Sequence, residues 1–131
     1  MKKLLIIDDI EINRILLEDM LCSDFEMIQA SGGKEAVSLI ESGEVPDAVL
    51  LDCIMPDMSG TEFLEIMSGK GFTERVPVVL MTAEPDEALL EKAFSLGAAD
   101  MIEKPFNYTV IRKRLSNLIA LFELSAEKAT V

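Results

Sequence analysis

The sequence predicts an α/β fold, a doubly wound, five-stranded parallel sheet with helices on both faces. Five short apolar runs alternate with five amphipathic stretches along the 131 residues, which is the pattern of buried parallel strands joined by helical crossovers. Four of these runs lead into an aspartate, a threonine or a lysine, and the carboxyl ends of parallel strands border one crevice. The chain shows no internal repeat and no linker rich in proline, glycine and serine, so we expect one domain.

The first strand and helix are predicted from the spacing of apolar residues. Lys3–Ile7 is largely apolar and is typical of a buried strand. Four apolar residues then recur at helical spacing, and we expect them to pack on the sheet: Ile12, Ile15, Leu16 and Met20. Phe25–Gln29 is more polar, which indicates a strand at the edge of the sheet.

Two helices flank the next strand. Lys34–Ser42 is amphipathic, and Gly43 provides a helix stop. Asp47–Leu51 is predicted to be the third strand. Thr61–Ser68 is predicted to be a helix whose inward side chains are Phe63, Leu64 and Met67.

Two further strands complete the predicted sheet. Val76–Met81 is the fourth, although Pro77 near its start cannot donate a hydrogen bond to the ladder. Asp86 can cap a helix that runs to about Ser95. We expect four of its residues to face inward: Leu89, Leu90, Ala93 and Phe94. Asp100–Glu103 is the last short strand.

The final helix begins after Asn107, which can cap it, and runs to at least Leu124. Its apolar residues step by 4, 3 and 4: Ile111, Leu115, Leu118 and Phe122. The first half of this seam should cover the sheet, whereas the second could continue as a coiled coil. We therefore expect one domain at residues 1–122, with residues 123–131 as an extension of the last helix or the start of a linker.

Charge and composition exclude several classes of protein. A net charge of −12 disfavours direct binding to nucleic acid or to an anionic membrane. The only basic cluster, at residues 112–114, fits a solvated helix face. Cys22 and Cys53 are too isolated for a disulfide framework, a zinc site or a redox dithiol. No apolar stretch has the length of a signal peptide or a membrane span, so we expect a cytoplasmic protein.

Chemistry-bearing residues stand at the ends of four predicted strands. Asp8 and Asp9 follow the first and Asp52 the third, and these carboxylates are the hard oxygen ligands that Mg²⁺ prefers. Lys104 follows the fifth and can hold a phosphoryl oxygen as a point charge. The Thr82 hydroxyl and the Ala83 backbone N–H, after the fourth, can bind another. The pattern predicts a site for a divalent cation and a phosphoryl group.

Each of these residues also has a purely structural interpretation. Aspartates at strand ends commonly cap helices or form turns, a threonine there is usually structural, and a Lys-Pro pair usually marks a turn. Four such coincidences, each at the carboxyl end of a different strand, favour the functional interpretation.

Five motifs occur in order along the chain: Asp8-Asp9; Leu51-Asp52 with Met55-Pro56 and Gly60; Met81-Thr82-Ala83; Gly97-Ala98 with Asp100; and Lys104-Pro105-Phe106. Together they resemble a response regulator receiver domain over roughly Lys3 to Leu121. The resemblance implies a flavodoxin-like (βα)5 fold with strand order 2-1-3-4-5, which is one of the common orders of open, doubly wound sheets. It also implies a phosphoprotein of two-component signal transduction rather than an enzyme.

The resemblance assigns a role to each site residue. Asp52 would accept a phosphoryl group from the phosphohistidine of a sensor histidine kinase or phosphotransfer protein. Asp9 would bind Mg²⁺ directly, Asp8 through water or as a second acid, and the Ile54 carbonyl would join Asp52 as a ligand. Lys104 would hold the phosphoryl group, with a cis peptide to the proline after it, and the domain would promote its own Mg²⁺-dependent phosphorylation and dephosphorylation.

The same resemblance implies a switching surface. On phosphorylation Thr82 would turn inward, and the surface formed by about Asp86–Ser95 and Asp100–Leu121 would contact an output domain or partner protein, or a second copy of the chain. The sequence departs from the family at Met101, where a tyrosine or phenylalanine is usual. An aromatic switch is therefore absent, although methionine can fill the same gap.

Other classes fit less well. A haloacid-dehalogenase-type phosphatase needs a second aspartate where this chain has Ile54, and the Asp8-Asp9 pair would repel the phosphate of FMN in a flavodoxin-like protein. A non-phosphorylated interaction module on this fold would be expected to lack part of the acid triad or the lysine. Two contexts remain open: the N-terminal receiver of a larger regulator, which we favour, and a stand-alone regulator.

Overall fold

The computed structural model describes residues 1–129 and contains five strands within that range. They are β1 (Lys2–Ile7), β2 (Phe25–Ala30), β3 (Ala48–Asp52), β4 (Val78–Thr82) and β5 (Asp100–Glu103). The helices are α1 (Glu11–Leu21), α2 (Gly33–Glu41), α3 (Gly60–Gly69), α4 (Phe72–Arg75), α5 (Glu87–Ser95) and α6 (Tyr108–Ala129).

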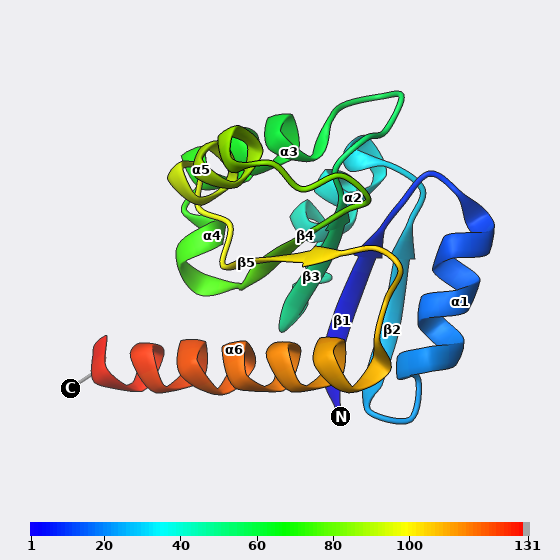
Figure 1. Cartoon of the computed structure of the whole chain (residues 1–131). Coiled ribbons are helices and arrows are strands. Elements are labelled where there is room, and N and C mark those ends of the chain that lie inside the picture. Colours follow the sequence, from blue (N-terminus) through cyan, green and yellow to red (C-terminus); the bar gives the residue numbers. More distant parts are fainter. Residues whose placement is uncertain (130–131) are drawn as a thin grey trace.

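The strands form one parallel sheet in the order β2-β1-β3-β4-β5, which confirms the predicted fold class. Figure 1 shows α1 and α6 on one face of the sheet and α2 to α5 on the other. Alternate residues of β1 enter the two cores: Leu5 and Ile7 pack towards α2 to α5, and Leu4 and Ile6 towards α1 and α6. The predicted edge position of β2 is also confirmed.

The short helix α4 was not predicted. Gly71 precedes it with a φ of 74°, a left-handed conformation that glycine adopts without steric cost. Phe72 is then buried in the core, and β4 begins at Val78 rather than at Val76. A four-residue helix is too short to show helical periodicity, so the sequence carried no signal for it. Pro77 donates nothing, but its carbonyl accepts from the Val49 N–H at 3.0 Å.

The predicted inward face of α1 is wrong. Ile12, Ile15 and Leu16 are 57%, 43% and 54% exposed, whereas Leu17 and Leu21 are fully buried. Met20 packs partly against the core. This helix carries apolar residues on more than one of its faces, so helical spacing alone does not identify the buried face. Contact with the sheet selects the face that carries Leu17.

The same correction applies in part to α5. Leu89 and Ala93 pack on the core as expected, but Leu90 and Phe94 are 37% and 45% exposed. Asp86 caps the helix as predicted, since its carboxylate accepts from the Leu89 N–H at 2.7 Å.

The last helix follows the prediction closely. Asn107 caps it by accepting from the Val110 N–H at 3.0 Å. Ile111 and Leu115 are buried as expected, and Ile119, which the predicted seam omitted, is buried too. An ion pair between Glu123 and Lys2 ties the far part of α6 to the start of β1. The last two residues of the predicted extension, 130–131, lie outside the described residues, and the domain boundary at residue 122 stays a prediction.

Two other features follow the sequence. Cys22 and Cys53 are free thiols, and Gly43 ends α2 with a φ of 105°. None of the helices in the described part of the chain has the length and apolar character needed to cross a membrane.

Candidate metal and phosphoryl site

The parallel sheet brings three of the predicted acids together at one edge. Asp8 and Asp9 follow β1, and Asp52 is the last residue of the neighbouring strand β3. One carboxylate oxygen from each lies within 4.8 Å of the other two. Hard oxygen atoms at this spacing fit a Mg²⁺ or Ca²⁺ ion better than a softer metal.

Asp8 offers a buried carboxylate oxygen to this site. Its side chain is fully buried, and Oδ1 accepts from the Ile10 N–H at 3.0 Å. Oδ2 is buried and has no hydrogen-bond partner among the described residues. Because buried carboxylate oxygens are normally satisfied, this orphaned atom fits a site completed by a positive ion or its water.

Arg14 supports the acidic loop from α1, a role that the sequence analysis missed. Its guanidinium donates to the Asp8 backbone carbonyl at 2.7 Å and to Gln29 Oε1 at 3.2 Å. These bonds hold the end of β1 against α1. The sequence did carry a signal for this role, because Arg14 lies one turn into the helix that follows the acid pair.

Lys104 reaches the acids from the end of β5. Its Nζ lies 3.0 Å from Asp52 Oδ1 and 4.0 Å from Asp8 Oδ2. Its backbone N–H donates to the Thr82 carbonyl at 2.8 Å, and its peptide bond to Pro105 is cis, as the resemblance implies. One ammonium therefore faces at least two carboxylates.

The electrostatic state of Asp52 reflects this crowding. Burial raises the pKa of its carboxyl above the ordinary value, and the negative charge of Asp8 raises it further. The hydrogen bond and positive charge of Lys104 oppose these effects on the pKa. Asp52 is therefore an acid whose ionised form needs additional positive charge nearby.

Thr82 and Ala83 lie at the adjacent strand end. Thr82 directly follows Met81, which pairs with Asp52 across β3 and β4. The Thr82 side chain is buried, and its hydroxyl oxygen accepts from the Glu84 N–H at 3.2 Å, so the hydroxyl proton remains available for donation. Ala83 is exposed at the start of the following loop.

The loop between β3 and α3 spans residues 53–59, and the backbone at its start packs closely against Gly60. A Cβ on Gly60 would lie 2.7 Å from the Asp52 carbonyl and 3.1 Å from the Cys53 Cα, so any larger residue would displace backbone. The Gly60 N–H donates to the Cys53 carbonyl at 2.9 Å. Within this loop Met55 is buried and the Ile54 side chain is 81% exposed.

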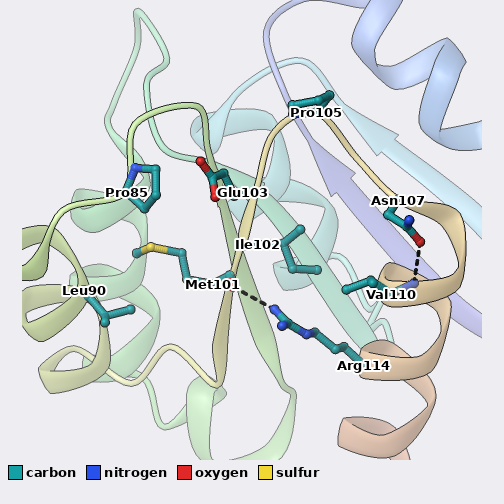
Figure 2. Close-up of a pocket in the computed structure, with 9 residues that line it drawn as sticks. All are labelled: Pro85, Leu90, Met101, Ile102, Glu103, Pro105, Asn107, Val110 and Arg114. Atoms are coloured by element: carbon teal, nitrogen blue, oxygen red, sulfur yellow. Dashed lines mark hydrogen bonds between the residues drawn. The ribbon is translucent and has the colours of Figure 1, made fainter.

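Met101 lines a separate hollow on the predicted switching surface. Figure 2 shows its side chain between Pro85 and Leu90, with Val110 and Arg114 on the α6 side. The hollow has a volume of about 360 Å³. Arg114 donates to the Met101 carbonyl at 3.2 Å and lies 3.8 Å from the Asp100 carboxylate. A flexible side chain therefore borders open space at the position where the family that the sequence resembles usually has an aromatic ring.

Known proteins match this sequence over nearly the whole chain. A family model described as "Response regulator receiver domain" matches residues 4–116. Sporulation initiation phosphotransferase F of Bacillus subtilis is 34% identical over 121 residues, which cover 92% of this chain and 95% of that protein. A probable chemotaxis protein CheY of Rhizobium etli is 33% identical over 121 residues, 92% of each chain.

Larger proteins contain a similar segment. Sensor histidine kinase TmoS of Ectopseudomonas mendocina is 33% identical over 119 residues, but these span only 12% of its length. For two further histidine kinases that match, the chain spans 8% of the length.

Solved structures agree with the fold. Vibrio cholerae chemotaxis protein CheY4 superimposes with a TM-score of 0.82 at 26% identity, covering 89% of this chain and 98% of that one. The signal receiver domain of a histidine kinase from Syntrophus aciditrophicus gives 0.81 at 26% identity, covering 92% and 91%.

Proposed function

Because the chain belongs to the family of response regulator receiver domains of two-component signalling, we propose that Asp52 is its phosphoacceptor. The observation that carries this proposal is the meeting of Asp52 with Lys104 Nζ at 3.0 Å, beside Asp8 and Asp9 at the carboxyl edge of the sheet. The phosphoryl donor is the phosphohistidine of a histidine kinase or phosphotransfer protein. Relatives that are themselves named histidine kinases and a phosphotransferase support this choice of partner.

Asp9, Asp52 and the Ile54 carbonyl would hold a Mg²⁺ ion, and Asp8 would act through water or as a second acid. The orphaned Asp8 Oδ2 and the three converging carboxylates support this set. When bound, the ion supplies positive charge to the transferring phosphoryl oxygens.

The residues of the chain position and neutralise the transferred group. An oxygen of Asp52 attacks phosphorus, an O–P bond forms, the P–N bond breaks, and its electron pair leaves with the imidazole of the donor. Lys104, which now pairs with Asp52, moves its ammonium to a phosphoryl oxygen. The Thr82 hydroxyl and the Ala83 N–H donate to another oxygen. Later attack of water on phosphorus breaks the bond between phosphorus and the Asp52 oxygen, releases inorganic phosphate and restores the carboxylate, so the domain promotes its own dephosphorylation.

The exposed face of α1 supports a docking surface for the donor. α1 begins two residues after Asp9, and Ile12, Ile15 and Leu16 on it are exposed. Leu16 also borders a hollow of about 540 Å³ between α1 and the start of α6, beside Met20 and Tyr108. A donor must bring its phosphohistidine to Asp52, so its apolar surface is expected to cover this side of the site.

We expect Leu16→Ala to slow phosphoryl transfer from a phosphorylated donor protein by about tenfold, because the costly residues of an interface cluster near its centre and a loss of about 1.4 kcal/mol there is tenfold. Transfer from a small phosphodonor should be unchanged, since that molecule needs no docking surface. Leu121→Ala is the matched control: Leu121 is 55% exposed, against 54% for Leu16, and lies two residues from Glu123, which pairs with the opposite end of β1. Equal slowing in both variants, measured by single-turnover transfer, would contradict the assignment.

The signal leaves through the surface of α5, β5 and α6, where Met101 borders the hollow of Figure 2. When Thr82 turns inward, it pulls the loop before α5 with it. The flexible side chain of Met101 then adjusts to fill the space between this loop and β5. The partner there is an output domain of a larger regulator in which this domain covers residues 1–122, or a separate protein or a second copy of the chain. Both long and short relatives occur among the similar proteins.

The direct test of the proposal is the intact mass of the protein after incubation with a small phosphodonor. A single phosphoryl adduct that forms with Mg²⁺ and not without it supports the assignment. No adduct in the presence of saturating Mg²⁺ would contradict it.

A further inference from the structure

The aspartate in the loop after β3, Asp57, makes a set of contacts that the proposed chemistry does not use. Asp57 accepts from three backbone N–H groups: Lys34 at 2.9 Å, Met58 at 2.8 Å and Gly33 at 3.3 Å. Gly33 and Lys34 begin α2, more than 20 residues away in the sequence. These bonds hold the ionised form and lower the pKa of the Asp57 carboxyl, the Lys34 bond most strongly.

The start of α2 is shaped to receive this carboxylate. Its N-cap residue, Gly32, has no side chain to cap the helix. A Cβ on Gly32 would lie 2.7 Å from Asp57 Oδ2, and a Cβ on Gly33 would lie 2.4 Å from Met58 Sδ. Because Gly32 is in an extended conformation that any residue adopts, the glycine pair serves close approach of the loop. A carboxylate there also complements the partial positive charge at a helix N-terminus.

We propose that Asp57 is a positioning residue for the metal site, because it clamps the loop of residues 53–59 against α2 and so holds the Ile54 carbonyl in place. This inference rests on the proposed function, in which that carbonyl is a metal ligand. Asp57 itself touches neither metal nor phosphoryl group.

The other anchors of the loop do not replace this clamp. The Cys53 N–H donates to the Met81 carbonyl at 3.1 Å, and the Gly60 N–H donates to the Cys53 carbonyl, so both fasten the loop at its first residue. Met55 is buried, but an apolar contact does not set the direction of a neighbouring carbonyl. Three hydrogen bonds to a charged acceptor, two of them to another element, restrict that direction more strongly. Preorganised ligands bind metal more tightly than mobile ones.

The test measures Mg²⁺ affinity by isothermal titration calorimetry on the folded, unphosphorylated chain. We expect Asp57→Ala to weaken binding about tenfold, the lower end of the effect seen for groups that support metal ligands. Asp57→Asn, whose amide oxygen still accepts backbone hydrogen bonds, should restore part of the loss. Asp86→Ala is the matched control, because it removes an aspartate that caps α5 from the residue just before that helix. It should lower stability and leave Mg²⁺ affinity unchanged.

A double-mutant cycle distinguishes the clamp from a general weakening of α2. Gly32→Ala should displace the Asp57 carboxylate and weaken Mg²⁺ binding several-fold. In the Asp57→Ala background the same change meets no carboxylate and should have no further effect. Independent structural damage would instead give additive losses.

Three outcomes would overturn the inference. The first is wild-type Mg²⁺ affinity in Asp57→Ala, the second is an equal loss in Asp86→Ala, and the third is additivity in the cycle. If the wild-type protein binds no Mg²⁺, the proposed function fails, and the inference that rests on it fails with it. A wild-type protein that binds Mg²⁺ and an Asp57→Ala variant that binds it equally well would remove the inference alone.

Discussion

Asp52→Asn will abolish the phosphoryl adduct while leaving the fold intact. Asparagine has nearly the shape of aspartate and can still accept a hydrogen bond from Lys104, which lies 3.0 Å from Asp52 Oδ1. Its amide lacks the anionic oxygen that attacks phosphorus, so no acyl phosphate forms. Intact-mass spectrometry with a small phosphodonor and Mg²⁺ should show one added phosphoryl group on the wild-type protein and none on the variant.

Asp86→Asn is the matched control for this experiment. It makes the same chemical change at an exposed aspartate whose capping bond to the Leu89 N–H an asparagine can also accept. This variant should acquire the adduct as the wild type does. An adduct of undiminished yield on Asp52→Asn would place the acceptor at another residue and remove the proposed role of Asp52.

Asp8→Asn is expected to have opposite effects on metal binding and on stability. Removal of this charge should weaken Mg²⁺ binding about 10- to 100-fold, as expected for a group that acts on the metal directly or through water. The metal-free protein should become about 1–2 kcal/mol more stable, a gain typical of relieving strain at a functional site. The reason is that Asp8 is fully buried beside Asp52 and its Oδ2 has no partner among the described residues. Lys104 keeps its closer partner, Asp52, so no charge is left unpaired by the change.

Urea unfolding without metal and calorimetric Mg²⁺ titration measure the two effects separately. Asp19→Asn, the same substitution at an exposed position of α1, should change neither quantity by a comparable amount. A loss of stability in Asp8→Asn would show that the pair with Lys104 at 4.0 Å outweighs the repulsion from Asp52. The account of a strained acidic pocket would then be wrong.

Much of the fold and the acidic cluster could be predicted because both depend on local sequence. A residue that follows a buried parallel strand must lie at the carboxyl edge of the sheet, whatever the packing elsewhere. Asp8 and Lys104 follow two such strands and Asp52 is the last residue of a third, and the structure brings them together.

The contacts of Asp57 show what could not be predicted. Two of the groups that donate to it, the N–H groups of Gly33 and Lys34, belong to a helix distant in the sequence. The glycine pair at the start of α2, Gly32 and Gly33, was only a weak signal of this contact, because glycines at the start of a helix have many explanations. Only the packing of the β3–α3 loop on α2 reveals their purpose.

The sequence by itself determined the five strands, which of them end next to the acids, the threonine and the lysine of the site, and the capped starts of α5 and α6. Apolar runs, capping residues and strand ends are local properties of the chain. The tertiary structure alone decided which face of α1 is buried, since Leu16 and Leu17 are both apolar and only Leu17 meets the sheet. It also decided that Leu90 and Phe94 stay exposed and that α2 is capped from another loop. These choices depend on which surfaces meet in space, and helical spacing allows several answers until the neighbouring elements are in place.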